Sequence, residues 1–496
     1  MRRSPRLALL LLPSLLTLVS CISAVKEFPS SDCNGAVPAQ FTRIYIGSPA
    51  HGGQQSGTSM EDPLDGTTAD KFDTILRTIA EGQHPTWGTQ SQIAPQNLIV
   101  CIDSGVFQTS GQYDWLIDAG HTKSAVNTGF TVEKNWRIHG HGANRTALKL
   151  IDLITDQFVA SDGTAFPGGH NIVIGTHSLD ASGIEISDLA IDANHDELNK
   201  STGLALNLSA IVLRSTGGGH WIHDVKLVGA SGDLGDMTPA LENFPVLIWG
   251  DSENGAPSES RGNLVEKTTL EKPGKRVGHG RSPGGSGIGV ANASAEVRNN
   301  LVQGYEIGYG GWSLREVWFH DNVAKDTGYG FNVDSFDNLG VLLESNQIIH
   351  PVAYGIVIGG SHPEQRFSGW RVLNNTIELS SPDTIGIVLQ GQVKGATFSG
   401  NKVFTDDPNP KGTIAIWSYS SGNGVINGGN IYQDNQFDRA LAMDFSADPD
   451  FDTNCRIGNR DLQDRPLADF PDNGGPSGCA AVAFPSRNLR EPPPGR

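Results

Sequence analysis

Short apolar runs recur along residues 296–419, and every copy of the pattern has three parts. One short run precedes an Asn, a second run follows it, and a third contains a Gly or small residue near its start. The Asn residues stand 22, 24, 29 and 26 positions apart in turn and are Asn300, Asn322, Asn346, Asn375 and Asn401. A repeat of this length with three short strands per copy is typical of a solenoid of stacked strands. The pattern therefore predicts an all-β chain, a parallel β-helix.

The Asn between the first two runs of each copy has a structural interpretation. A tight bend between two strands needs a residue that tolerates a positive φ angle, and Asn does so at low cost. Stacked Asn side chains can also hydrogen-bond to one another along a solenoid. We therefore expect these five residues to support the fold, and we assign them no chemistry.

The third run of each copy alternates, and strand alternation assigns its faces. Its apolar positions are predicted to point inward: Ile307, Tyr309, Phe331, Val333, Ile356, Ile358, Ile387 and Leu389. The intervening positions are predicted to point outward: Gly308, Gly310, Asn332, Asp334, Val357, Gly359, Val388, Gln390, Trp417 and Tyr419. This outer face carries small residues in several copies, polar residues in the middle copy and aromatic residues toward its ends. It could admit a ligand, or its Gly residues could only ease the bend into each copy.

The stretch before the repeats contains the one clear helix pattern. Apolar residues Phe72, Ile75, Leu76 and Ile79 share one helical face, and Gly82 follows them as a stop signal. We expect residues 25–169 to form an entry and capping region, residues 170–445 the rungs of the solenoid, and residues 446–496 a C-terminal coil and tail.

Residues 1–24 have the pattern of an export signal. Arg2, Arg3 and Arg6 precede an apolar run that is interrupted and short for a membrane span. Leu18-Val19-Ser20-Cys21 resembles a bacterial lipobox, which would place cleavage before Cys21 and a lipid on its sulfur. Ordinary cleavage near Ala24 is the alternative. Both predict an extracytoplasmic protein, secreted or lipid-anchored, whose membrane contact is limited to that lipid.

Four cysteines remain beyond the export signal, an even number that suggests disulfides in an exported protein. Cys455 and Cys479 flank a Gly/Pro/Asp-rich coil with little core of its own, so their pairing is expected. Cys33 with Cys101 follows by elimination. Buried free thiols are the alternative, and no Cys/His pattern indicates zinc.

Charge narrows the class of partner. The chain of 496 residues has a formal net charge of -18, which argues against nucleic acid as its main partner. One loop, residues 267–286, is locally basic and could attract a polyanionic polymer. A solvated, flexible loop is the alternative. The substrate-binding candidates in this basic loop are Lys275, Arg276, His279 and Arg281.

The order of elements resembles the pectate-lyase/pectin-lyase superfamily. An amphipathic helix is followed by an early strand with the turn His139-Gly140-His141-Gly142, and then by the repeats. The resemblance covers roughly residues 65–445 and implies a right-handed parallel β-helix whose N-terminal helix caps the open end. It also implies that the outer face of the third strand carries the substrate groove. The superfamily includes lyases, glycoside hydrolases, epimerases and inert adhesins, so the resemblance specifies architecture and leaves activity open.

The proposed groove contains one carboxylate in its middle copy, Asp334, with Asn332 on the same face. A lyase acting on a uronic-acid polymer must neutralise a carboxylate, remove the neighbouring proton and protonate the leaving oxygen. A hydrolase needs two carboxyl groups. We expect Asp334 as the central acid/base or cation ligand and Glu306 as the second carboxylate. Lys325 or Arg315 would be the charge-neutralising base.

Substrate binding is expected along the same face, and its candidates beyond the basic loop are Asn332, Trp249, Trp312, Gln390, Trp417 and Tyr419. The sequence thus predicts a carbohydrate-active protein that cleaves a polysaccharide as a lyase or glycoside hydrolase. The alternative is a non-catalytic β-helix that binds glycans or joins a surface assembly. No metal-ligand set is predicted, and a calcium ion beside the acidic residue stays open.

Overall fold

The computed structural model describes most of the chain, with gaps mainly at the two ends and in connections between strands. The described residues are 30–48, 55–83, 95–110, 112–116, 124–153, 158–159, 165–166, 170–176, 180–202, 207–232, 244–250, 260–272, 285–333, 338–359, 367–391, 393–419, 427–447, 451–468 and 470–473. The predicted export signal, Cys21 included, and residues 474–496 of the tail lie outside them.

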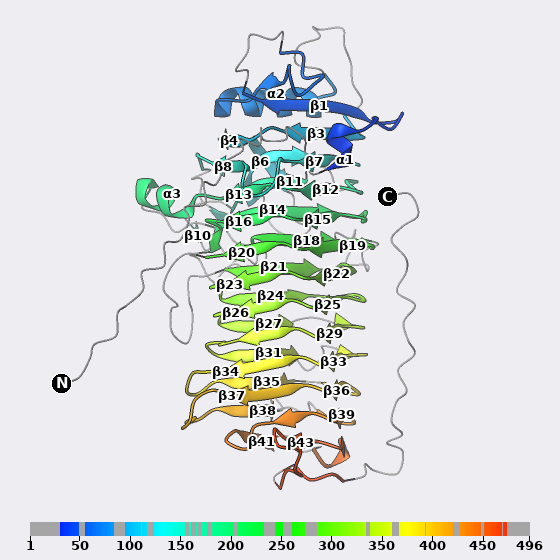
Figure 1. Ribbon diagram of the computed structural model, residues 1–496, viewed down its shortest axis with the longest axis vertical. Helices are drawn as coiled ribbons and strands as arrows, with labels where there is room; N and C mark the ends of the chain where they lie inside the picture. Colours follow the sequence, from blue (N-terminus) through cyan, green and yellow to red (C-terminus); the bar gives the residue numbers. More distant parts are fainter. Residues whose placement is uncertain are drawn as a thin grey trace, which may run out of the picture.

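Three long sheets wrap around one axis, and each rung contributes one strand to each sheet in the order sheet 1, sheet 2, sheet 3 (Figure 1). Sheet 1 consists of β2 (Leu64–Asp65), β1 (Thr42–Gly47), β3 (Leu98–Ile102), β7 (Arg137–His139), β12 (Glu185–Ser187), β15 (Trp221–His223), β19 (Asn263–Glu266), β22 (Ala295–Arg298), β25 (Trp318–His320), β29 (Leu342–Glu344), β33 (Arg371–Leu373), β36 (Thr397–Ser399), β39 (Ile431–Gln433) and β42 (Cys455–Ile457).

Sheets 2 and 3 complete the rungs. Sheet 2 consists of β4 (Gly105–Thr109), β8 (Thr146–Leu150), β13 (Ala190–Asp192), β16 (Lys226–Val228), β20 (Thr269–Glu271), β23 (Leu301–Gln303), β26 (Val323–Lys325), β30 (Gln347–Ile349), β34 (Thr376–Leu379), β37 (Lys402–Thr405), β40 (Gln436–Phe437) and β43 (Arg460–Asp461). Sheet 3 consists of β5 (Gln112–Leu116), β6 (Ser124–Val132), β11 (His170–Thr176), β14 (Asn207–Ser215), β17 (Ser231–Gly232), β18 (Val246–Gly250), β21 (Ser286–Ala291), β24 (Ile307–Trp312), β27 (Tyr329–Val333), β31 (Tyr354–Gly359), β35 (Ile385–Gln390), β38 (Ile414–Tyr419) and β41 (Ala442–Ala447).

Pairing between successive rungs is parallel throughout the three sheets, and three antiparallel pairs occur among the described strands. These pairs join β5 to β6, β14 to β17, and β9 (Phe158–Val159) to β10 (Ala165–Phe166). A short parallel pair outside the three sheets joins β28 (Asn338–Leu339) to β32 (Phe367–Ser368). The prediction of an all-β parallel β-helix is confirmed. Parallel pairing already joins β1 to β3 and continues to β42 and β43, so the expected limits of 170 and 445 enclose only part of the paired rungs.

The predicted helix is α2 (Ala69–Ala80), and it covers the N-terminal end of the solenoid (Figure 1). The Thr68 side chain accepts a hydrogen bond from the Lys71 amide, which caps the helix start. Its four apolar residues are buried in the same core as Ile44 and Phe107 of the first strands. The helix therefore keeps an end rung from exposing its apolar side chains. Two shorter helices, α1 (Ser31–Asn34) and α3 (His195–Thr202), were not predicted.

An aromatic cap covers the other end of the described solenoid. Phe470 is fully buried and stacks on Phe445, with the ring centroids 5.4 Å apart. It also meets Tyr432 and Phe437 of the last rungs edge to face. The segment expected to be coil thus includes two strands of a further rung, a short 3-10 helix (Phe451–Thr453) and a hydrophobic closure.

The predicted Asn ladder is present and longer than expected. Each ladder Asn donates from Nδ2 to the Oδ1 of the next, for example Asn300 to Asn322 over 3.0 Å and Asn346 to Asn375 over 2.9 Å. The ladder continues through Asn435 to Asn459. The expected reason for Asn needs correction, because the positive φ falls on the residue before each ladder Asn, such as Asp321 and Ser345. The ladder Asn is required for its side-chain amide.

The predicted faces of the third strand hold except at its start. Tyr309, Phe331 and the later apolar positions lie in the core, but Gly308 faces inward and Ile307 does not. A Cβ on Gly308 would lie 2.9 Å from the Cβ of Ala324 in the core, whereas a Cβ on Gly310 would meet the Ile307 side chain at 3.3 Å on the outer face. Two successive inward residues occur at this corner, so simple alternation fails there. The inward glycines of the column are Gly287, Gly308, Gly330, Gly355 and Gly386.

The disulfide between Cys33 and Cys101 is present, with the two Cα atoms 5.9 Å apart. Cys455 is also disulfide-bonded, and its expected partner, Cys479, lies outside the described residues. Within the described part of the chain, no helix is long and apolar enough to cross a membrane.

Candidate functional site

Next to β18 and β21 the connections at the two edges of sheet 3 are long, whereas the turn from sheet 1 to sheet 2 is short. Only Lys267 and Thr268 separate β19 from β20, yet residues 251–262 separate β18 from β19 and residues 272–285 separate β20 from β21. Functional residues are disproportionately found beside variable connections on a rigid scaffold. Sheet 3 is therefore the face on which the chain offers most room for a site.

The outer face of sheet 3 is organised in rows that follow the strand register. One row runs through Leu247, Gly289, Gly310, Asn332, Val357, Val388 and Trp417. A second row, two positions later, begins with Trp249, Ala291 and Trp312 and continues with Gly359, Gln390 and Tyr419. The apolar members of both rows form clusters separate from the main core, so these positions lie outside the barrel of the solenoid.

An aromatic cluster occupies the N-terminal half of this face. Trp249 and Trp312 meet edge to face with their ring centroids 6.1 Å apart, and both are partly exposed. Phe244 packs 6.1 Å from Trp312 and covers Gly289, where a Cβ would lie 2.5 Å from its ring. The guanidinium of Arg214, a side chain only 3% exposed, lies 4.3 Å from the Trp249 ring centroid. This contact places a fixed positive charge against one of the two packed indole rings.

A second aromatic cluster occupies the C-terminal half. Tyr329 and Tyr354 lie one rung apart with ring centroids 5.1 Å apart. They pack with Val357, Val388 and the partly buried Trp417. The face therefore has aromatic side chains on both sides of its middle rungs.

Asn332 lies between the two clusters. Its side chain is half-buried, and its Oδ1 is buried without a hydrogen-bond partner in the part of the chain that the structure describes. A buried amide oxygen without a partner is unfavourable by roughly 1–3 kcal/mol. Among the predicted outward positions, Asn332 thus retains an unused acceptor of the kind that a ligand hydroxyl would satisfy.

The structure spreads the predicted catalytic residues over both edges of sheet 3. Glu306 directly precedes β24, and its carboxyl lies where a Cβ on Gly328 would be 2.8 Å away. Lys325 ends β26 at this same edge, which joins sheets 2 and 3. Arg315 follows β24 at the opposite edge, where its carbonyl accepts a hydrogen bond from Ser294. Glu306 and Lys325 thus share an edge, and Arg315 does not.

The remaining predicted site residues are placed in part. Gln390 ends β35 and is half-buried, in register with Tyr419 at the end of β38. Asp334 and the four candidates of the basic loop, Lys275, Arg276, His279 and Arg281, lie outside the described residues, as does the side chain of Tyr419. No contact of Asp334 with Asn332 or Glu306 is therefore assigned.

The outer face of sheet 1 carries titratable groups that the sequence analysis missed. Two strands contain the same motif, Trp221-Ile222-His223-Asp224 and Trp318-Phe319-His320-Asp321. In each, the Trp and His rings stack, with centroids 3.9 Å apart in the first and 3.7 Å in the second. The repeated Trp-x-His-Asp was the available signal in the sequence.

Each of these histidines is held between two carboxylates. Nε2 of His223 lies 3.3 Å from Glu185 of the preceding rung, and Nδ1 lies 2.9 Å from Asp224. Burial alone would lower the pKa of His223, but these hydrogen bonds outweigh burial and raise it. His320 has the same relation to Glu296 and Asp321, and its pKa is raised for the same reason.

Arg298 connects the two histidine sites. Its Nε donates to Glu266 over 2.8 Å, and its Nη1 donates to Glu296 over 2.7 Å. Glu266 also accepts a hydrogen bond from the indole of Trp221 over 3.1 Å. These polar groups satisfy one another's hydrogen bonds across several rungs. The network therefore stabilises the packing of neighbouring rungs in sheet 1.

Two clusters among the described residues have the composition of metal sites. One combines His350, Glu378 and the exposed Asp406, and the other combines Asp32, His139 and Glu185. In the second cluster, Nη1 of Arg137 donates to Asp32 over 2.6 Å, and Nε of Arg137 lies 3.9 Å from Glu185. The guanidinium already supplies a positive charge to both carboxylates there, so this cluster is an ion-pair network. The calcium ion left open at Asp334 falls outside the described residues.

The fold defined by these sheets is a right-handed parallel β-helix. Similar solved structures include a tailspike protein of E. coli bacteriophage HK620, with TM-score 0.54 and 10% identity, covering 86% of this chain and 67% of that one. A variant of this tailspike in complex with pentasaccharide gives TM-score 0.53 and 11% identity, covering 84% of this chain and 66% of that one. The mannuronan C-5 epimerase AlgE6 A-module of Azotobacter vinelandii gives TM-score 0.44 and 12% identity, covering 80% and 96%. No protein-family model matches the chain, and comparison with curated protein sequences gives no match.

Proposed function

We propose that this protein binds an extended polysaccharide along the outer face of sheet 3 and cleaves it as a lyase or a glycoside hydrolase. The observation that carries the proposal is the half-buried Asn332 with its unpaired amide oxygen between two partly exposed aromatic clusters. Aromatic rings offer flat apolar surfaces to sugar rings, and polar side chains satisfy hydroxyl groups. The tailspike with a related fold, whose complex contains pentasaccharide, supports a saccharide as the ligand.

Rungs are spaced about 4.8 Å apart, so a row of side chains along the axis provides regularly spaced contacts. Trp249 and Trp312 would stack on one part of the polymer, and Trp417 on another. The Arg214 guanidinium beneath Trp249 would favour an acidic sugar at that end. An acidic polysaccharide is therefore the favoured class of substrate.

Cleavage requires an acid/base group in the middle of this face. Asp334 would be that group, with Glu306 as the second carboxylate. Lys325, at the same edge of sheet 3 as Glu306, would be the base that neutralises a uronate. Arg315, at the opposite edge, would contact the polymer from the other side.

A non-catalytic glycan-binding protein is the second candidate. It is favoured by the separation of Arg315 from Glu306 and Lys325 across sheet 3, because a catalytic set must converge on one bond. Binding by the aromatic clusters would then be the whole function. In both cases we propose an extracytoplasmic location, because disulfides such as Cys33–Cys101 form and persist in oxidising compartments.

The test combines binding and turnover on one panel of neutral and acidic polysaccharides. Absorbance of unsaturated uronates reports a lyase, and release of reducing ends reports a hydrolase. Asp334→Asn is expected to abolish turnover but keep binding, whereas Trp312→Ala is expected to weaken binding by roughly threefold to tenfold, the range for one aromatic contact. Phe404→Ala, which removes a partly exposed ring from sheet 2, is the matched control and should change neither.

The outcomes separate the candidates. Binding without turnover would leave the glycan-binding protein and remove the enzyme. No binding to any polymer, or equal losses in Trp312→Ala and Phe404→Ala, would contradict the proposed site on sheet 3.

A further inference from the structure

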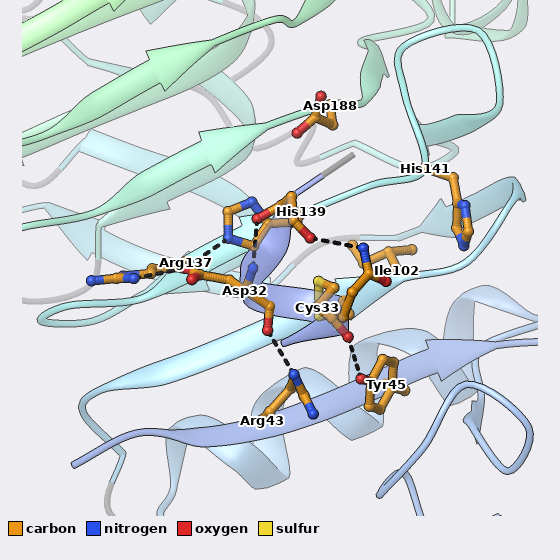
Figure 2. Close-up of a disulfide and its surroundings, with 12 residues drawn as sticks. Asp32, Cys33, Arg43, Tyr45, Ile102, Arg137, His139, His141 and Asp188 are labelled. Carbon is orange, nitrogen blue, oxygen red and sulfur yellow. Dashed lines mark hydrogen bonds and ion pairs between the residues drawn. A yellow bond between two sulfur atoms is a disulfide. The ribbon is translucent and has the colours of Figure 1, made fainter. Parts of the chain in front are cut away.

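The N-terminal segment 30–41 lies against the outer face of sheet 1, where it makes a small hydrophobic cluster of its own. Cys33 packs with Tyr45, Ile99 and Cys101, and Phe41 is partly buried against them. The disulfide joins Cys33 to β3, and the Tyr45 hydroxyl donates to the Cys33 carbonyl over 2.5 Å. Figure 2 shows this disulfide with Asp32, Arg137 and His139 beside it.

Asp32 of α1 is the point where the segment meets β7. Its Oδ2 accepts a hydrogen bond from Nη1 of Arg137 over 2.6 Å and lies 3.6 Å from Nε2 of His139. His139 is 0% exposed, and its Nε2 has no hydrogen-bond partner among the described residues. A buried imidazole nitrogen therefore points toward the carboxylate of a surface segment.

The hydrogen bond at Nδ1, the other ring nitrogen of His139, determines which nitrogen carries the proton in the neutral imidazole. Nδ1 lies 2.9 Å from Oγ of Ser187, and the Ser187 hydroxyl donates to Oδ2 of Asp188 over 2.7 Å. Because a carboxylate only accepts, the single hydroxyl proton belongs to the bond with Asp188. Oγ of Ser187 must then accept a hydrogen bond from the Nδ1–H group, and Nε2 is the nitrogen that faces Asp32.

A neutral imidazole in this tautomer would direct a lone pair at negative charge. Atoms of Asp32, His139 and Glu185 lie within 4.8 Å of one another. One positive charge is required at Nε2, and either a proton or a metal ion can supply it. Arg137 already contacts both carboxylates, and His223 contacts Glu185 from the next rung. A proton adds one further positive charge at Nε2, whereas a divalent ion would add two beside these cations, so the proton is favoured.

We propose that protonated His139 is a pH-operated latch that holds the N-terminal segment 30–41 on sheet 1. The imidazolium donates to Ser187 and attracts Asp32, and it faces Cys101 of β3 on its other side. Loss of its proton leaves Asp32 with Arg137 alone and places a lone pair against two carboxylates. The latch is closed while the imidazole carries its second proton, and it releases the segment when that proton is lost.

The pKa of Asp32 determines how far the pH can fall before the latch loses its negative partner. The neighbouring His139 imidazole lowers the pKa of Asp32 to about 2, and Arg137 adds to this effect against the opposing effect of burial. Asp32 therefore keeps its charge well below the ordinary range of an aspartate. The segment precedes the β-helix directly after residues 1–29, so a lipid on Cys21 would be attached to the solenoid through this latch.

Hydrogen exchange followed by mass spectrometry on the full-length protein tests the proposal. Amide protection in residues 31–41, corrected for intrinsic exchange and compared with β24, is followed from about pH 5 to about pH 9, where histidines in proteins titrate. We expect protection of the segment to fall by about tenfold or more while that of β24 stays constant. The measurement is repeated after reduction of Cys33–Cys101, which removes the covalent tether and should enlarge the fall.

Variants distinguish the latch from general loosening. His139→Gln and Asp32→Asn should each abolish the pH dependence, whereas Tyr45→Phe removes a neutral hydrogen bond and should lower protection equally at every pH. If a variant fails to fold, the wild-type titration with and without reductant still decides. Protection that does not change with pH would overturn the proposal. Stoichiometric zinc in the purified protein, found by elemental analysis and lost in Asp32→Asn, would also overturn it, because the metal would then occupy the place of the proton.

Discussion

Nε2 of His320 lies 3.1 Å from Oε1 of Glu296, which belongs to the neighbouring strand of sheet 1. The same relation joins His223 to Glu185, several rungs closer to the N-terminus. In both places the His stacks on a Trp of its own strand, and the carboxylate of the Asp that follows accepts a hydrogen bond from Nδ1 of the His. Two copies of one arrangement thus connect neighbouring rungs through titratable groups.

These pairs predict a stability optimum on the acidic side of neutrality. The pKa of His320 is raised in the folded protein, so its contribution is complete below the ordinary histidine pKa and is lost as pH rises through the raised value. The pKa of Glu296 is lowered, chiefly by its hydrogen bond with His320, so its contribution is lost as pH falls below the ordinary glutamate range. We expect the free energy of unfolding to be highest between about pH 4.5 and pH 6.5. Urea unfolding measured across pH checks this.

A pair of variants assigns the effect to the histidine. His320→Gln should flatten the decline above neutral pH. His350→Gln is the control, because His350 is more exposed and its carboxylate partners lie 3.6–3.7 Å away. An equal flattening in both variants would mean that the pair with Glu296 is not the cause.

The Asn ladder predicts a large loss from one small substitution. Asn346 donates to the Phe319 carbonyl over 3.0 Å and to Asn375 over 2.9 Å, and its Oδ1 accepts from Asn322. Asn346→Ala leaves several buried groups unpaired and should lower the free energy of unfolding by about 2–4 kcal/mol. Denaturant titration measures the loss. Asn409→Ala, at an exposed turn, should stay within about 0.5 kcal/mol of wild type.

The inward glycines predict that adding one methyl group is harmful. A Cβ on Gly330 would lie 2.5 Å from the Gly355 carbonyl oxygen and 2.6 Å from the Ile348 side chain. Gly330→Ala should therefore destabilise the protein by about 1–3 kcal/mol through overpacking. The same register position holds Ala415 in the next-to-last rung, where the pairing with β41 is irregular. Ala415→Gly is the matched control, with an expected change of about 0.5–1 kcal/mol.

The Cys33–Cys101 disulfide predicts a measurable loss on reduction. It closes a loop with a sequence separation of 68 residues, and cross-links of this size stabilise a fold by about 2–4 kcal/mol. Cys33→Ser/Cys101→Ser should reproduce the effect of a reductant on the denaturation midpoint. If the double variant were as stable as the oxidised protein, the disulfide would be a tether for α1 alone.

The solenoid could be predicted from the sequence because its determinants recur locally. The ladder residues and the buried Phe331 and Ile356 repeat at one position in every copy, so periodicity revealed them without any long-range information. The orientation of Ile307 and Gly308 could not be obtained that way. The chain turns a corner at Gly308, and alternation applies only to a regular strand.

The candidate site was less predictable because its contacts join different rungs. Glu296 and His320 are 24 positions apart, and Glu185 and His223 are 38 positions apart, so no motif within one rung contains both partners. The row through Gly310 and Asn332 was predictable because register follows from the repeat. Which residues meet at the edges of sheet 3 depends on long connections, and a repeat pattern carries no information about those.

The Asn ladder makes the length of this molecule adjustable. Every ladder residue binds its neighbour in the same way, so removal of residues 322–345 would bring Asn346 next to Asn300 with the donor and acceptor already matched. Both end caps would be untouched, since α2 and β41 lie at the two extremes of the solenoid (Figure 1), and Phe470 packs on Phe445 of β41. Unequal recombination between copies could therefore shorten or lengthen the chain by whole rungs in a single event. The length of the outer face of sheet 3 along the axis is then set by the number of rungs that the gene encodes.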